Sequence, residues 1–145
     1  MPPPKTIVRF HYLEKGFSLS ERTRLKEGLR TLFSKERRRQ EELDYIFCSD
    51  DYLRGLNRQF LQHDYYTDIL SFDLSEPGGA GKAEIYISVD RVRENAEKLG
   101  VSFKNELHRV IFHGALHLCG FRDKTPEEQA KMRKMEDKYL SSYLG

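Results

Sequence analysis

Two histidines four residues apart are the residues of this sequence best suited to chemistry. A helix would place His113 and His117 on one face, about one turn apart, within reach of a single metal ion. Gly120 then allows the backbone to turn, and Asp123 follows three residues later. Two imidazole nitrogens and one carboxylate oxygen fill three corners of a tetrahedron and leave the fourth for water, as catalytic zinc requires. We therefore predict a metal site formed by His113, His117 and Asp123.

The expected ion is Zn²⁺, one per chain. Such an ion lowers the pKa of bound water from about 15.7 to near 7, which makes hydroxide available at neutral pH. A carboxylate is a harder ligand than imidazole, so manganese or iron remains the alternative. Zinc proteases carry H-E-x-x-H, in which the glutamate is the general base, but Gly114 occupies that position here. The general base is left unassigned; Asp68 and Asp73 are candidates, and a structural role is the simpler interpretation of both.

The other histidine near the pair and the two cysteines are interpreted as structural. His108 lies five residues before His113 and falls on a different helix face. Cys48 and Cys119 are too few for a disulfide framework, and no C-x-x-C occurs. Free cysteines are commonly buried, which is the expectation for both. For Cys119, two residues after His117, a metal or redox role is the alternative.

Hydrophobic periodicity predicts the elements that must position these residues. Strands are expected over 5–10, 43–48, 69–74 and 83–89, and helices after 18–21 and over 50–60, 89–99, 102–118 and 126–140. The turn-forming residues 76–81 indicate that the strands on either side pair antiparallel. This order predicts an α+β fold, a small mixed β-sheet of about four strands covered by helices. The metal site would lie on the most apolar helix, 102–118, which we expect to be central and buried.

Three helix starts carry recognisable caps. Ser18 and Glu21 fit a capping box, and Ser49 followed by two aspartates favours a second helix start. Thr125, then proline, then Glu128 predicts the start of the last helix. The apolar stripe of the helix over 50–60 is expected to comprise Leu53, Leu56 and Phe60.

Length and composition fit one domain over residues 1–145. The chain is 33% charged and 38% hydrophobic, with no apolar run long enough to span a membrane, and its first five residues lack the apolar core of a signal peptide. We expect a cytoplasmic protein. The net charge of +2 is unevenly distributed, because residues 1–40 carry 11 Lys and Arg against 4 Asp and Glu. Such a segment can steer a protein to a polyanion, or it can be a solvated helix face.

The run from His113 to Asp123 resembles the YbeY family of metal-dependent endoribonucleases, whose motif is H-G-x-L-H-L-x-G-[YF]-x-H. The family's leucine-asparagine helix end and its T-[DN]-[VI]-L-S-F strand are matched by Leu56-Asn57 and by residues 67–72. Residues 83–88 are similar to the family's G-D-I-x-I-S strand, and the similarity covers roughly residues 43–140. The matching residues of the metal motif are His113, Gly114, Leu116, His117, Leu118, Gly120 and Phe121.

Two positions depart from the family pattern. Asp123 stands where the family has its third histidine, which keeps a ligand but lowers the net charge of the site by one. Leu61 stands where the family places an arginine implicated in activity and RNA handling, and Arg58 or His63 would have to compensate. The second departure bears on the nuclease mechanism more than on the metal site.

The resemblance implies a single-strand-specific endoribonuclease acting in ribosomal RNA 3′-end maturation and ribosome biogenesis. Its partners would be ribosomal RNA and the ribosomal subunit, with no membrane; the oligomeric state is left open. Basic residues would hold phosphates without reading bases. The alternatives are a ribosome-associated RNA-binding factor with a structural metal and a zinc hydrolase of another class, such as a peptidase. The candidate RNA contacts are Arg58, His63, Arg37, Arg38 and Arg39, together with the helix face Arg22, Arg24, Lys26 and Arg30.

Overall fold

A four-stranded sheet forms the centre of the molecule in the computed structural model, which describes residues 5–63 and 66–144. β1 (Ile7–Tyr12), β2 (Glu42–Cys48) and β4 (Lys82–Ser88) run parallel, whereas β3 (Ile69–Asp73) joins β4 antiparallel. The strand order is β1-β2-β4-β3, so β3 is an edge strand. The predicted mixed sheet and the antiparallel pairing across residues 76–81 are therefore confirmed.

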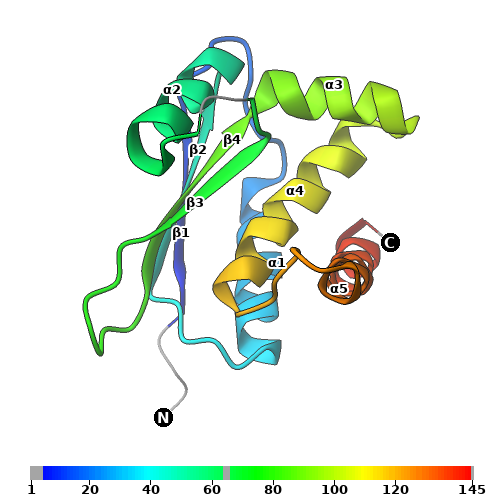
Figure 1. Ribbon diagram of the computed structural model, residues 1–145. Helices are drawn as coiled ribbons and strands as arrows, with labels where there is room; N and C mark the ends of the chain where they lie inside the picture. The colour runs from blue at the N-terminus through cyan, green and yellow to red at the C-terminus, as the bar shows by residue number, and fades with distance from the viewer. Residues whose placement is uncertain (1–4, 64–65, 145) are drawn as a thin grey trace.

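Helices cover both faces of the sheet unequally (Figure 1). One face carries α1 (Arg22–Lys35), α3 (Val89–Leu99), α4 (Phe103–Leu118) and α5 (Pro126–Leu144). The other face carries α2 (Asp50–Leu61), which packs Leu53 against Cys48 and Leu70. Within the described residues the order of elements is the predicted one, and the α+β class is confirmed.

α4 is the central helix because apolar side chains surround most of it. Leu107, Ile111 and Leu116 are buried in the main core with the inward side chains of β2 and β4. The buried Tyr45 of β2 donates a hydrogen bond to the carbonyl of Ile111 (2.8 Å), which ties the sheet to the middle of the helix. Only a narrow stripe of α4 is left for polar side chains, and this stripe carries the histidine pair.

The helix starts agree with the sequence in two of three cases. Ser49 accepts a hydrogen bond from the amide of Tyr52, and Thr125 and Glu128 form the predicted reciprocal box. The predicted box at Ser18 is wrong, since α1 begins at Arg22 after Glu21, whose side chain makes no capping bond. Leu19 explains the later start: it is buried in the core, and its amide donates to the Tyr12 hydroxyl.

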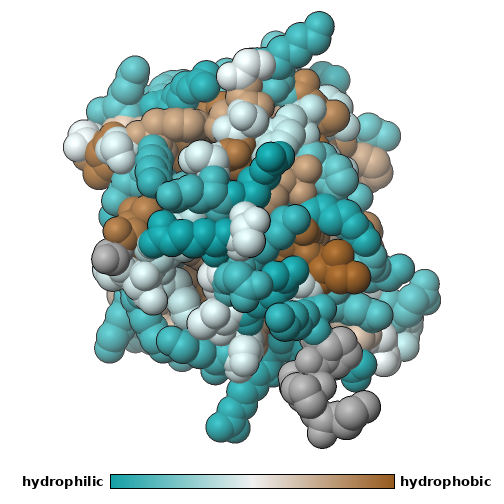
Figure 2. Space-filling model, turned by 180° about the vertical axis from the view of Figure 1, so that it is seen from behind, coloured by the Kyte–Doolittle hydropathy of each residue, from teal (hydrophilic) through white to brown (hydrophobic). Residues whose placement is uncertain are grey.

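The surface contains scattered apolar side chains. Phe60, predicted to lie on the inner stripe of α2, is instead 58% exposed, and its ring meets that of Phe72 in an edge-to-face arrangement. Seen from the side of α1, hydrophilic residues cover most of the molecule and brown apolar spots are separate (Figure 2). No helix among the described residues is both long and apolar enough to cross a membrane. Residues 1–4, where we expect no targeting segment, lie outside the described residues.

Candidate metal centre

The histidine pair faces outward from the C-terminal half of α4. His113 and His117 are partly exposed, and their ring centroids lie 4.6 Å apart with an interplanar angle of 79°. The opposite side of the helix is buried against the sheet, so both imidazoles project on the remaining side. This is the arrangement that the i, i+4 spacing predicts.

A turn after α4 brings Asp123 back to the two imidazoles. Gly120 has φ 98°, a left-handed conformation that favours glycine, and the amide of Phe121 donates to the carbonyl of Leu116. Two residues beyond Asp123, the Thr125 cap fixes the start of α5. The short segment carrying Asp123 is thus anchored at both ends.

The three side chains converge on one point. Oδ2 of Asp123 lies 3.2 Å from Nε2 of His113 and 3.3 Å from Nε2 of His117. One candidate ligand atom from each residue falls within 4.8 Å of the others, so the group could hold a metal ion. Two imidazole nitrogens and one carboxylate oxygen are donors that suit a first-row transition metal. The side chains are between 20% and 38% exposed, which leaves one side of the centre open.

A second carboxylate fixes the orientation of His113. Nδ1 of His113 donates to Oε2 of Glu136 over 2.6 Å, and Oε1 of Glu136 accepts from Arg109 over 3.1 Å. This bond places the proton on Nδ1 and leaves the Nε2 lone pair directed at the centre. Burial lowers the pKa of His113, but the hydrogen bond and charge of Glu136, with Asp123 and Asp68, outweigh burial and raise it.

The role of Glu136 was not predicted from the sequence, although a signal is present. On α5, the buried residues Met132, Glu136, Tyr139, Leu140 and Tyr143 follow helical spacing. A glutamate within such an otherwise apolar stripe needs a buried partner, because an unpaired buried charge is costly. That partner is formed by His113 and Arg109, 23 and 27 residues earlier in the chain.

Gly114 is a packing residue in this fold. A Cβ atom at position 114 would lie 2.9 Å from Cδ1 of Ile85 and 3.0 Å from Cδ1 of Ile69, both tighter than ordinary van der Waals contacts. A side chain at this position would therefore require the two isoleucines to shift, so glycine allows the closest packing of α4 on the sheet. The glutamate of an H-E-x-x-H site would point at these two isoleucines of the sheet, which argues against the peptidase alternative.

An open groove of about 680 Å³ adjoins the centre, and we call it the site groove. Its walls are β3 with the residues before it, the end of α2, and the segment after α4. Of the predicted RNA contacts, only Arg38 lines it, together with Leu61, which occupies the family's arginine position. The other polar and charged lining residues are Thr67, Asp68, Ser71, Asp73, His117, Asp123 and Lys124.

The remaining predicted RNA contacts lie elsewhere. Arg58 and His63, near the end of α2, are exposed and do not line the site groove. Arg37 is exposed outside it, and Arg39 lines a neighbouring cavity. On the predicted basic face of α1, Arg24 covers the ring of Tyr143 and Arg30 pairs with Glu27 over 2.6 Å.

The two candidate bases differ in environment. Asp68 lines both the site groove and a small cavity of about 130 Å³ beside His113 and Glu136. Burial is the main cause that raises the pKa of Asp68. Asp73 is exposed, and hydrogen bonds from Ser75 lower its pKa. Of the two, Asp68 is the carboxylate that lies beside His113 and has the raised pKa.

The residues interpreted as structural lie outside the group. His108 is buried, its Nδ1 lies 2.7 Å from the carbonyl of Lys104, and its ring stacks on Tyr143. Cys48 is buried and Cys119 is partly exposed, and neither belongs to the group that could hold a metal. Burial is the main cause that raises the pKa of each thiol to about 12, which keeps both protonated at neutral pH.

Comparisons with known proteins agree on one family. The model of the family described as Endoribonuclease YbeY matches residues 14–144. The Endoribonuclease YbeY of Cytophaga hutchinsonii is 50% identical over 134 residues, which cover 92% of this chain and 94% of the relative. That of Flavobacterium psychrophilum is 41% identical over 94% of this chain and 96% of its own. The solution structure of TM1509 from Thermotoga maritima superposes with a TM-score of 0.63 at 32% identity, covering 94% of this chain and 91% of that one.

Proposed function

Because the chain belongs to the YbeY family of endoribonucleases, we propose that it hydrolyses single-stranded RNA at the His113, His117 and Asp123 centre. Its substrate would be ribosomal RNA near the 3′ end, processed in the cytoplasm as part of a ribosomal subunit. The whole chain would serve as one endoribonuclease domain. The observation that carries the proposal is the convergence of two imidazole nitrogens and one carboxylate oxygen beside an open groove.

The donor set supports zinc as the ion. Three protein ligands with an open fourth position are typical of catalytic zinc sites. When bound, such an ion supplies Lewis acidity and makes water a nucleophile at neutral pH. Glu136 holds His113 so that Nε2 is available, and Asp123 offers a charge that imidazole lacks.

Residues that line the site groove would bind the RNA and accept a proton. Arg38 and Lys124 are the cations that line the site groove in the described part of the chain, and they would bind the phosphates of the RNA backbone. Asp68 would accept the proton of the attacking water, since burial raises its pKa and the carboxylate lies in the groove wall. These contacts are to phosphate and water, so no base would be read.

The experiment combines metal content with RNA cleavage. Elemental analysis of the wild-type protein should find about one transition-metal ion per chain, and Asp123→Ala should be strongly depleted. Asp73→Ala is the matched control, because it removes a carboxylate from the same groove without touching the centre. Wild type and Asp73→Ala should cleave single-stranded RNA, and Asp123→Ala should not. Equal metal content in wild type and Asp123→Ala would refute Asp123 as a ligand.

One observation favours a second candidate, an RNA-binding factor with a structural metal. Leu61 gives the site groove an apolar side chain, 44% exposed, at the position where the family has its arginine. RNA binding and cleavage assays distinguish the two candidates. If the protein is a binding factor, folded Asp123→Ala should still bind RNA, and the wild-type protein should yield no cleavage product. Unfolded polypeptide offered in parallel tests the peptidase alternative, for which no cleavage is expected.

A further inference from the structure

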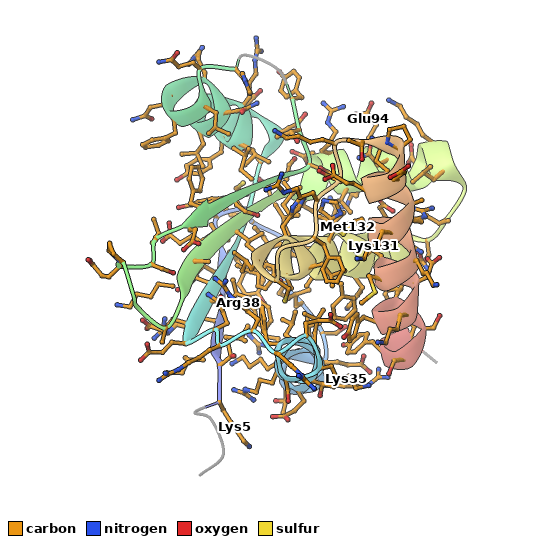
Figure 3. The ribbon with its side chains drawn as sticks, turned by 60° about the horizontal axis from the view of Figure 1, so that its bottom comes forward. Lys5, Lys35, Arg38, Glu94, Lys131 and Met132 are labelled. Atoms are coloured by element: carbon orange, nitrogen blue, oxygen red, sulfur yellow. The ribbon has the colours of Figure 1, made fainter. Side chains whose placement is uncertain are left out.

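A second groove, of about 450 Å³, lies between the C-terminal half of α1, the segment after it and the residues just before β1. Its charged lining residues are five cations and one anion, and we call it the basic groove. Figure 3 labels three of the cations: Lys5 just before β1, Lys35 at the end of α1, and Arg38 in the segment after α1. The charged lining residues are Lys5, Glu27, Arg30, Lys35, Arg38 and Arg39.

Most of this positive charge is available to a ligand. Arg30 is occupied, because it pairs with Glu27 over 2.6 Å and donates to the carbonyl of Thr6 over 2.9 Å. Lys5, Lys35 and Arg39 are exposed, and none of them forms an ion pair with a described residue. An uncompensated cluster of this kind attracts a polyanion.

Arg38 belongs to both grooves. It lines the basic groove on one side and the site groove, with His117 and Asp123, on the other. Its Nε donates to Oε1 of Gln40 over 3.3 Å, and its Nη2 lies 4.0 Å from Oδ2 of Asp73. The side chain is 34% exposed, so the guanidinium keeps donors that can reach a phosphate from either groove.

The segment that carries these arginines is held in place. Gln40 is buried, its carbonyl accepts from the Thr6 hydroxyl, and its side-chain amide donates to the carbonyl of Glu42. The amide of Glu41 donates to the carbonyls of Ala80 and Gly81 in the turn between β3 and β4. Arg38 and Arg39 therefore extend from a fixed backbone, which lowers the entropy cost of binding.

We propose that the RNA backbone on one side of the cleaved bond passes Arg38 and continues along the basic groove. This inference rests on the proposed function and adds the path of the substrate to it. The contacts would be to phosphates and therefore independent of base sequence. Because the basic groove lies on one side of the centre only, RNA added beyond the cleaved bond should strengthen binding in one chain direction and not in the other.

The test compares Lys35→Gln/Arg39→Gln with Lys15→Gln/Lys134→Gln. Both double variants remove two exposed positive charges, but Lys15 and Lys134 line neither groove. Binding of fluorescently labelled oligouridylate is followed by fluorescence anisotropy over a range of salt concentrations, and a denaturing gel checks that the RNA is intact. Steady-state cleavage is measured with oligonucleotides extended stepwise at the 5′ or the 3′ end.

We expect the groove variant to bind about tenfold more weakly than wild type at low salt, and its salt slope to fall by roughly 0.7 per lost phosphate contact. Its KM for long RNA should rise with little change in kcat, and the control should match wild type. In wild type, extending the RNA at one end should lower KM, and this decrease should be absent in the groove variant. If wild type is active but the two double variants have equal salt slopes and equal KM values, the proposed RNA path is refuted and the proposed function is not affected. Failure of wild type to cleave any RNA would instead refute the proposed function.

Discussion

At the scale of single residues, the candidate centre combines a local motif with distant support. His113, His117 and Asp123 could be predicted because they fall within 11 consecutive residues, and a helix followed by a glycine turn determines their relative positions. Glu136 and Arg38 reach the centre and its groove only through tertiary packing. Arg38 is among the predicted RNA contacts and the apolar stripe of α5 marks Glu136 as a buried charge, but only the structure shows what these two side chains contact.

Substitution of Glu136 should weaken metal binding without removing a ligand. In Glu136→Gln the side chain keeps its size but loses the charge that holds the Nδ1 proton of His113, and we expect metal affinity to fall about 10- to 100-fold. Competition with a chromophoric chelator at pH 8, where protons compete little with the metal, measures the change. Asp137→Asn is the control, because Asp137 also pairs with Arg109 but does not contact His113. An unchanged affinity in Glu136→Gln would show that this hydrogen bond does not orient the ligand.

Asp68 should set the acidic limb of the pH–activity profile. Burial raises the pKa of its carboxyl, and the unprotonated form is the proton acceptor, so activity should fall at a higher pH than for an ordinary aspartate as the solution is acidified. Asp68→Asn should lower kcat about 10²- to 10⁴-fold and leave the metal content unchanged. Steady-state cleavage from pH 4 to pH 9 measures both effects. Full activity in Asp68→Asn would exclude this residue as the base.

At the scale of elements, the order of helices and strands and the antiparallel pairing of β3 with β4 could be predicted, whereas the parallel pairing of β2 with β1 and β4 could not. Apolar periodicity and turn residues are local signals, and they identify every helix and strand found in the described residues. The position of β4 between β2 and β3 depends on contacts between distant segments. The box predicted at Ser18 failed for the same reason, since burial of Leu19 outweighs a local capping preference.

The close approach of α4 to the sheet predicts an unusual response to alanine. Gly114→Ala should destabilise the protein by about 1–3 kcal/mol, because the added Cβ would overlap Ile85 and Ile69. Gly55→Ala, in the middle of α2 with nothing within 4 Å of the added atom, should be stabilising by about 0.5–1 kcal/mol. Urea unfolding of both variants measures the difference. A stabilised Gly114→Ala protein would mean that the helix does not lie this close to the sheet.

At the scale of the whole molecule, charge is organised around the two grooves. The excess of positive charge in residues 1–40 had two interpretations in the sequence, a polyanion site and a solvated face. In the structure these positive charges fall into two groups. Arg24 and Arg30 contact Tyr143 and Glu27 within the protein, whereas Lys35, Arg38 and Arg39 line the basic groove. Composition reveals the excess, but only the fold distinguishes the engaged side chains from the available ones.

Metal should stabilise the folded chain as a whole. The centre joins α4 to the segment that leads into α5, and an ion bound only by the folded state adds about 2.7 kcal/mol at a free concentration of 100 Kd. The midpoint of thermal unfolding should therefore rise by about 5–10 °C on adding zinc to metal-free protein. Asp123→Asn should show little or no rise. The same midpoint with and without zinc in the wild type would indicate that no tight site exists.

The contact between Gly114 and the sheet also limits how this scaffold can be redesigned. An engineer who wished to install a glutamate beside the histidine pair, and so obtain peptide hydrolysis, would first need to trim Ile85 and Ile69 to make room. Those two isoleucines belong to neighbouring strands and pack under α4, so the remodelling would sacrifice part of the core for the new reaction. The packing of the core around Gly114 therefore limits which reactions the centre can support, in addition to the choice of ligands.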